Sequence, residues 1–316
     1  MIRAGTLLLV SVVVVLGVGV ALAADPVAVI TEIHPAGGEV LVKTAEDAEW
    51  KAPKPLLALR PGDAVRVTGR GRVVLVLTGG RGSQTVTQTN SPFTVGRAGE
   101  GGTERSCSVV STVTAFLAGQ QRERTYVSLA VRSARPQPPV IIGPRETAIL
   151  NGRPVFEWTG PSQGRYRIKL HGPQGIVWQQ DDLPVAPVSY PTSAPALSPG
   201  TKYHWELEAP KAPTQQADFE VVNTGDDRRI RSALESLTSQ HASGYPASTL
   251  VVMRAGFLLQ EGLADEARRE LVAAIKKQDE ATLQQLLGRV YERIGLKHLA
   301  DDAFERAEAL AAGSDR

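Results

Sequence analysis

The chain has 316 residues and a formal net charge of +2, which leaves room for two or three domains that each bury a core. A net charge this small gives no electrostatic reason to expect nucleic acid or an anionic membrane surface as a partner. Cys107 is the one cysteine, which excludes an intramolecular disulfide, a site built on several cysteines and a CxxC redox motif.

The N-terminus has the pattern of a targeting segment. After Arg3 comes an apolar run from Thr6 to Val20, and Ala21-Leu22-Ala23 places small residues where signal peptidase requires them. We predict a signal peptide at residues 1–24. Residues 4–24 are also long enough to span the inner membrane, so an uncleaved anchor is the alternative. In either case we expect the rest of the chain to be periplasmic or otherwise extracytoplasmic.

Residues 25–98 alternate short apolar runs with Gly- and Pro-rich turns, which predicts a β-rich module. The expected strands are 27–33, 38–42, 63–67, 73–77 and 84–88. A G-x-V-x-V strand from Gly38, then Trp50, then L-x-x-G-D from Leu59 resembles the periplasmic domain of FecR-like proteins. The resemblance implies a β-roll or solenoid-like sheet that recognises other proteins or envelope components. Only five residues precede Thr6, so we do not expect the sigma-factor segment of the iron-transport regulators.

Residues 99–139 form an extension that ends in a Pro-rich linker. Residues 104–119 allow two interpretations. One is a short helix with Val109, Val113, Phe116 and Leu117 on one face, and the other, favoured by the abundant Ser and Thr, is an irregular cover or a further strand. Residues 126–131 are predicted to form a strand, and residues 135–139 a stiff extended linker.

Residues 140–222 predict a second β-rich module, an antiparallel sandwich with turns every eight to twelve residues. The expected strands are 140–142, 148–150, 154–158, 165–171, 175–179, 189–190, 202–208 and 217–222. Phe156 and Trp158, followed by the Leu197–Trp205 run with Pro-Gly before Tyr203, resemble a fibronectin type III or immunoglobulin-like domain. The resemblance implies a spacer or an adhesive surface, with Trp158 in the core.

Within this module, Gly160–Gly164 matches the G-x-S-x-G text of a hydrolase nucleophile elbow. That chemistry needs a strand-to-helix turn that raises the serine above a sheet. A strand with alternating polar and apolar residues follows Gly164, so we expect a hairpin loop here.

In residues 223–316 the apolar period changes from 2 to 3.6, which predicts helices. The expected helices are 226–240, 247–261, 264–277, 281–294 and 297–312. A comparison at an offset of 33 residues aligns Gly262 with Gly295 and resembles a tetratricopeptide repeat, in which Phe304 and Leu271 would pack between repeats. Arg254 stands at a usually apolar position in the first copy.

Two copies rarely bury enough surface alone, which leaves two alternatives: helix 226–240 is a third element, or the array docks on the sandwich. We also considered that a partner chain covers the last apolar face. The tetratricopeptide resemblance implies an inner groove lined by the first helix of each pair. It would place Gln285, Arg289 and Glu292 in that groove as partner-binding residues.

The inventory of reactive residues predicts no enzyme, since the five histidines stand without HExxH, HxH or histidine–carboxylate spacing. We expect no catalytic residue, no cofactor and no metal site. The leading hypothesis is a multidomain, non-catalytic protein-interaction or envelope-scaffold protein. Its protein partners would bind the helical array and the β modules, and it would touch a membrane only through an uncleaved N-terminal segment. The alternatives are a membrane-anchored FecR-type sensor and a carbohydrate- or peptidoglycan-binding module that uses Trp50 and Trp178.

Overall fold

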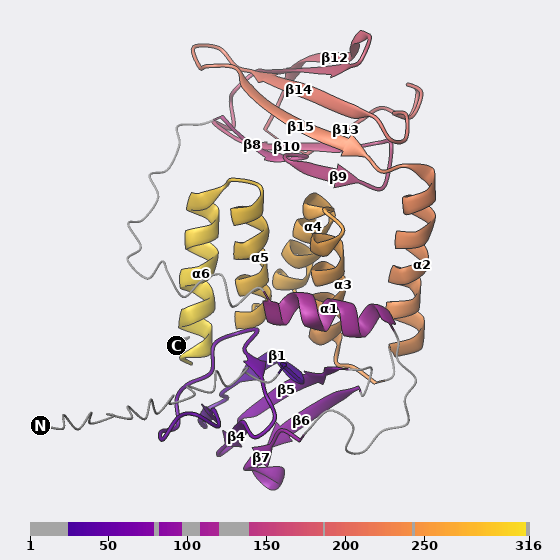
Figure 1. Ribbon diagram of the computed structural model, residues 1–316. Coiled ribbons are helices and arrows are strands. Elements are labelled where there is room, and N and C mark those ends of the chain that lie inside the picture. The colour runs from indigo at the N-terminus through magenta and orange to yellow at the C-terminus, as the bar shows by residue number, and fades with distance from the viewer. Residues whose placement is uncertain are drawn as a thin grey trace, which may run out of the picture.

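The computed structural model describes residues 25–78, 82–96, 108–119, 139–185, 187–241 and 244–313. Within these residues it contains four β-sheets, six α-helices and a short 3₁₀ helix (η2, Gln88–Asn90), and a layer of α-helices lies between two β-rich parts (Figure 1). The predicted targeting segment at residues 1–24 and the predicted strand at 126–131 lie outside the described residues, as does most of the 135–139 linker. None of the helices in the described part is both long and apolar enough to span a bilayer.

The N-terminal part consists of two small open sheets with the strand orders β3-β1-β5-β6 and β2-β4-β7. Their facing sides share one core, in which Ile30, Val65 and Leu75 are buried. A solenoid was one expectation for this region, but its described residues form two separate sheets. The strands are β1 (Ala28–His34), β2 (Val40–Lys43), β3 (Ala58–Leu59), β4 (Ala64–Val67), β5 (Arg72–Leu77), β6 (Ser83–Thr87) and β7 (Phe93–Thr94).

Strands β1 and β5 are buried on both faces, which explains their nearly continuous apolar sequences. Ile30 packs into the sheet core, whereas Val29 and Val76 belong to the core shared with the helices. The β1–β5 register shifts between Ile30 and Glu32. A bulge of this kind lets consecutive residues point to the same side, and both Thr31 and Glu32 contact Thr249 of the helical layer.

The second β-rich part is a pair of sheets with the orders β13-β10-β8 and β12-β11-β14-β15-β9. Trp158 is buried in the core between them, as predicted, and Trp205 is fully buried and donates a hydrogen bond to the Pro144 carbonyl at 2.8 Å. The strands are β8 (Val140–Gly143), β9 (Thr147–Ile149), β10 (Val155–Thr159), β11 (Tyr166–Gly172), β12 (Gly175–Leu183), β13 (Val188–Ser189), β14 (Lys202–Glu208) and β15 (Gln215–Val221).

The prediction of a purely antiparallel sandwich is wrong at one edge, because β9 pairs with β15 in parallel. The three residues after β8 carry the chain from the three-stranded sheet to the five-stranded sheet. After this change of sheet, β9 lies beside β15 at the edge of the five-stranded sheet, and the two strands run in the same direction. All other strand pairs in this part are antiparallel.

The five helices after residue 222 agree with the predicted ranges to within two residues at each end. Gly262 and Gly295 follow the first helix of each pair with φ of +80° and +78°, a conformation that glycine adopts without strain. The helices are α1 (Ser108–Gly119), α2 (Thr224–His241), α3 (Ala247–Gln260), α4 (Ala264–Ile275), α5 (Ala281–Arg293) and α6 (Lys297–Ala311). Of the open range 104–119, residues 108–119 are described and form helix α1, which lies across the helical layer (Figure 1).

Two residues explain how the helices pack. A Cβ atom added to Gly288 would lie 2.4 Å from the Phe304 ring, so the absence of a side chain at Gly288 lets α5 and α6 approach closely. Arg254 of α3 pairs with Glu270 of α4 at 2.6 Å and donates to the Thr238 hydroxyl of α2 at 2.8 Å. Arg254, at a position where an apolar residue was expected, therefore links α2, α3 and α4 through polar contacts.

Both predicted ways of covering the two repeat copies occur together, namely an additional helix and docking on the sandwich. Helix α2 packs on α3, and the sandwich docks on α4 through β9. In the described part of the chain the exposed large hydrophobic residues are Ile176 and Val177 of β12. On the last helix, Leu299 and Leu310 are half-buried, and a partner chain that covers this face stays a prediction.

Candidate functional site

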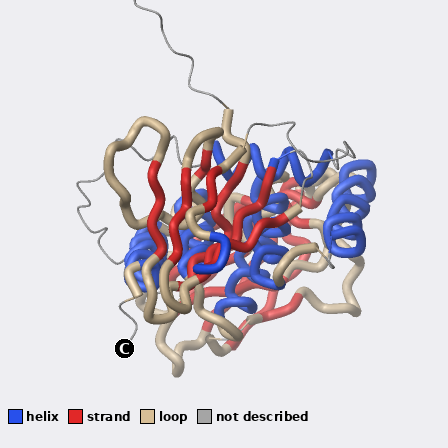
Figure 2. Tube along the Cα trace, turned by 90° about the horizontal axis from the view of Figure 1, so that it is seen from below, coloured by secondary structure: helices blue, strands red, loops and turns tan. Residues whose placement is uncertain are grey.

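The three residues expected to line an inner groove differ in their exposure. Gln285 is half-buried, Arg289 is buried and Glu292 is exposed, all on α5. Both α3 and α5 contact β1, and α3 also contacts α1. Seen from the side of the N-terminal sheets, strands lie over the helical layer (Figure 2). The chain therefore covers much of this side of its own helical layer.

A polar cluster lies at this junction between β1 and the helices. Glu32 is 1% exposed, and its Oε1 atom accepts hydrogen bonds from the backbone N–H and the hydroxyl of Thr249, at 3.1 and 2.8 Å. Glu280, which precedes α5, accepts a bond from the Ser248 hydroxyl at 2.6 Å. One ligand atom of each of Glu32, His34 and Glu280 lies within 4.8 Å of the other two.

The two carboxyl groups of this cluster, Glu32 and Glu280, have pKa values shifted in opposite directions. Burial alone would raise the pKa of Glu32, but hydrogen bonds from His34 and Thr249 and the charges of His34 and Arg72 outweigh it and lower this pKa. Burial raises the pKa of Glu280, and the hydrogen bond from Ser248 offsets only part of the effect. Glu32 is therefore the more acidic of the two carboxyl groups.

Sequence reasoning missed this cluster, although one signal was present. Glu32-x-His34 places a carboxylate and an imidazole two residues apart on a strand, where their side chains point to the same face. The expectation that no histidine has carboxylate spacing is therefore wrong. Glu280 follows 246 residues later, and no local pattern connects it to β1.

The second junction, between the sandwich and α4, is held by backbone and side-chain hydrogen bonds. The Ala148 N–H donates to the Gly262 carbonyl at 3.0 Å, and the Leu150 N–H donates to Oε1 of Glu266 at 3.0 Å. The other carboxylate oxygen of Glu266 is buried and has no hydrogen-bond partner within the described part of the chain. Burial, together with the charge of Asp265, raises the pKa of Glu266 to about 7.

A buried ion cluster lies beside Glu266. Arg268 is 4% exposed, and its Nη2 atom lies 2.8 Å from both Asp265 of the same helix and Glu157 of β10. Arg269 also pairs with Asp265. Because the Arg268 side chain is buried and paired with two carboxylates, we interpret this cluster as a structural link between the sandwich and the helical layer.

Two histidines lie opposite each other on β11 and β14 at the edge of a cavity of about 710 Å³. His204 Nδ1 lies 2.7 Å from Asp218, and His171 Nε2 lies 3.7 Å from Glu206. The cavity lining contains no serine or cysteine, and the Thr147 hydroxyl donates to the Ala148 carbonyl at 2.8 Å. The titratable groups at this cavity are therefore histidines, carboxylates, Lys202, Tyr203 and Arg293.

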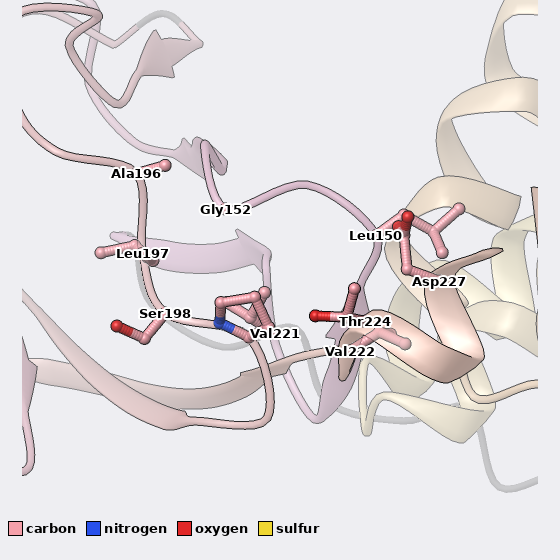
Figure 3. A pocket seen from close by; sticks show the side chains of 10 residues that line it. Leu150, Gly152, Ala196, Leu197, Ser198, Val221, Val222, Thr224 and Asp227 are labelled. Atoms are coloured by element: carbon pink, nitrogen blue, oxygen red, sulfur yellow. The ribbon is translucent and has the colours of Figure 1, made fainter.

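A second, smaller pocket of about 360 Å³ lies where the sandwich meets the start of α2 (Figure 3). Its lining is mainly aliphatic, with Ser198, Thr224 and Asp227 as the polar side chains. Asp227 already pairs with Arg231 at 2.9 Å. The one titratable side chain in this lining is therefore already in an ion pair.

The hydrolase-like Gly160–Gly164 segment is a loop that connects β10 to β11. The strands belong to different sheets, so the expected hairpin is wrong, although a strand and not a helix does follow. A Cβ atom on Gly160 or Gly164 would lie 2.2 or 2.5 Å from the Tyr166 hydroxyl oxygen, which explains both glycines by packing.

Strand β12 is the outer strand of the five-stranded sheet and pairs only with β11 in the described part of the chain. Eight of its nine residues are exposed or half-buried, and Ile176 and Val177 are 56% and 44% exposed. Its Trp178 is half-buried and stacks on Phe156 at 5.5 Å between ring centroids. Trp50 is also half-buried, beneath the Arg66 guanidinium at 4.6 Å. Neither tryptophan is a fully exposed platform.

Comparison with known proteins adds no assignment. No protein-family model matches this chain, and no curated protein matches it significantly.

Proposed function

We propose that this chain is an extracytoplasmic, non-catalytic scaffold that binds a partner protein along the outer edge of β12. The observation that carries the proposal is that the nine-residue strand has one paired edge and bears the exposed pair Ile176 and Val177. An unpaired strand edge offers a row of backbone donors and acceptors to an added strand. The exposed apolar pair supplies side-chain contacts for such a partner.

The partner that fits this edge is a protein segment in extended conformation that carries apolar side chains. At the far end of β12, Asp181 pairs with Arg167 and Asp182 with Arg165. Because these charges are already balanced, we expect affinity to come from backbone pairing and apolar contact. Of the three α5 residues assigned from the tetratricopeptide resemblance, Glu292 alone is exposed, which makes β12 the better docking surface.

We propose a finer fold assignment along the same lines. Residues 25–98 would form a FecR-type module, 140–222 a fibronectin type III or immunoglobulin-like sandwich, and 223–316 a tetratricopeptide-like array. The hydrogen bond from the Ser198 N–H to the Tyr203 hydroxyl at 2.9 Å and the Gly288–Phe304 contact support the last two assignments. The apolar run of residues 1–24 supports export.

Site-specific photo-crosslinking in cells that make the protein tests this function. We expect a photoreactive residue at Val177 to give a discrete protein adduct, whereas the same residue at Thr85, exposed on β6, gives none. Replacing Ile176 with Asp should abolish the Val177 adduct, because a charge in a desolvated contact opposes binding. Equal adducts from both positions, or a Val177 adduct that survives Ile176→Asp, would contradict the proposal.

A further inference from the structure

Three side chains with metal-ligand chemistry converge where β1 meets the helical layer. Glu32 and Glu280 are buried and His34 is half-buried, and one ligand atom of each lies within 4.8 Å of the others. Two of these residues come from β1 and the third from the residue before α5. The fold therefore brings together a set of donors that no single segment contains.

Glu280 gives independent evidence that the cluster is built for a ligand. The residue is 6% exposed, and Ser248 donates a hydrogen bond to its Oε1 atom at 2.6 Å. The Oε2 atom is buried and has no hydrogen-bond partner among the described residues. A buried carboxylate oxygen without a partner is costly, and a cation held between Glu280, Glu32 and His34 would remove that cost.

We propose that Glu32, His34 and Glu280 bind one divalent transition-metal ion of the Zn²⁺ class. One imidazole nitrogen and two carboxylate oxygens suit Zn²⁺, whereas Mg²⁺ and Ca²⁺ favour sites made of oxygen alone. Bonds from Zn²⁺ to such ligands are about 2.0–2.2 Å long, so small side-chain rotations bring the three donors onto the ion. His34 is half-buried and gives the ion a route from solvent.

Arg72 is the residue that competes with the ion. Its Nη2 atom lies 3.4 Å from Oε2 of Glu32 and 3.1 Å from Nε2 of His34. The Arg72 side chain is 48% exposed, so it can turn into solvent when a cation arrives. The bound ion would then join β1 to the helical layer and stabilise the folded chain.

Calorimetric titration of the full chain with Zn²⁺ tests the site, in a Cys107→Ser background that removes the thiol as a competing ligand. We expect one Zn²⁺ per chain and no comparable binding of Mg²⁺. Glu280→Gln and His34→Ala should each weaken binding at least about tenfold. Arg72→Gln should tighten it, because the competing positive charge is gone.

The matched control is His204→Ala, which removes a histidine from the other histidine–carboxylate group, on β14. This variant should bind Zn²⁺ as the parent does. Zinc should also raise the thermal midpoint of the parent but not that of His34→Ala. No binding by the parent, unchanged binding in Glu280→Gln and His34→Ala, or loss of binding in His204→Ala would each overturn the proposal. If Glu280→Gln fails to fold by circular dichroism, His34→Ala decides, since His34 is partly exposed.

Discussion

The pKa of Glu266 depends on the packing of the sandwich against α4. One oxygen of its carboxyl group accepts the Leu150 N–H at 3.0 Å, and the other is buried with no hydrogen-bond partner among the residues that the structure describes. The pKa of this carboxyl group rises from 4.5 to about 7 in the folded protein. Between these two pH values the folded protein therefore keeps a proton on Glu266 that the unfolded chain has released. Raising the pH from about 4.5 to 7 therefore favours the unfolded state at this site, with no further loss above that range.

Replacing Glu266 with Gln should remove this dependence, because the amide oxygen can still accept the Leu150 N–H and carries no charge. We expect the free energy of unfolding of the parent to fall by up to about 3 kcal/mol between pH 4.5 and 7 relative to that of Glu266→Gln. Urea unfolding at a series of pH values measures the difference. Glu308→Gln on α6, where the residue is exposed, is the control. Parallel curves for the parent and Glu266→Gln would contradict the assignment.

At the scale of elements, α1 acts as a cover for α3. Val113 and Leu117 are fully buried, and a Cβ atom on Gly256 would lie 3.0 Å from the Leu117 side chain. Helix α1 also contacts β1 and α2. It therefore fills the space where the helical layer, the N-terminal sheet and α2 meet.

Leu117→Ala should leave a cavity at this contact and lower the free energy of unfolding by about 2–5 kcal/mol. Chemical denaturation followed by circular dichroism measures this loss. Ala115→Ser, at an exposed position of the same helix, should change stability by less than about 0.5 kcal/mol. A similar small effect for both variants would mean that α1 does not pack on α3 as described.

At the scale of the whole molecule, two polar junctions fix the β-rich parts on the helical layer. Buried contacts made by Glu32 and Thr249 hold one side, and those made by Glu157 and Arg268 hold the other. Junctions of this kind couple neighbouring parts, so we expect the described part of the chain to unfold in one transition.

Tryptophan fluorescence and circular dichroism test the coupling, since three of the four tryptophans lie in the sandwich while the helices dominate the dichroism at 222 nm. The two signals should change together in the parent. Arg268→Met leaves the half-buried Glu157 without its cation and the buried Asp265 with Arg269 as its cation. Both midpoints should fall together, with a loss of about 3 kcal/mol in the free energy of unfolding. Arg165→Met breaks an exposed pair and should cost at most about 1 kcal/mol. Separate transitions in the parent would show that the sandwich unfolds independently.

Local pattern was sufficient to predict most of the elements. The change of period after residue 222 identified five helices, and Gly262 and Gly295 marked their boundaries because a helix often ends where glycine adopts positive φ. The alternation in residues 165–171 and 202–208 likewise identified β11 and β14. These helices and strands could be predicted because each pattern depends on residues that are close together in the sequence.

The sequence by itself therefore determined the order and type of most elements, because propensity and apolar period act over a few residues. The two-residue strands β3 and β7 were not predicted, and the sequence left the state of α1 open. Only the tertiary structure decided that β9 joins β15 in parallel, that α1 and β1 cover α3, and that Glu280 approaches Glu32 and His34. These outcomes depend on contacts between residues more than a hundred positions apart or on a change of sheet within a short loop. No local pattern records such contacts, because they form only when the separate cores pack together.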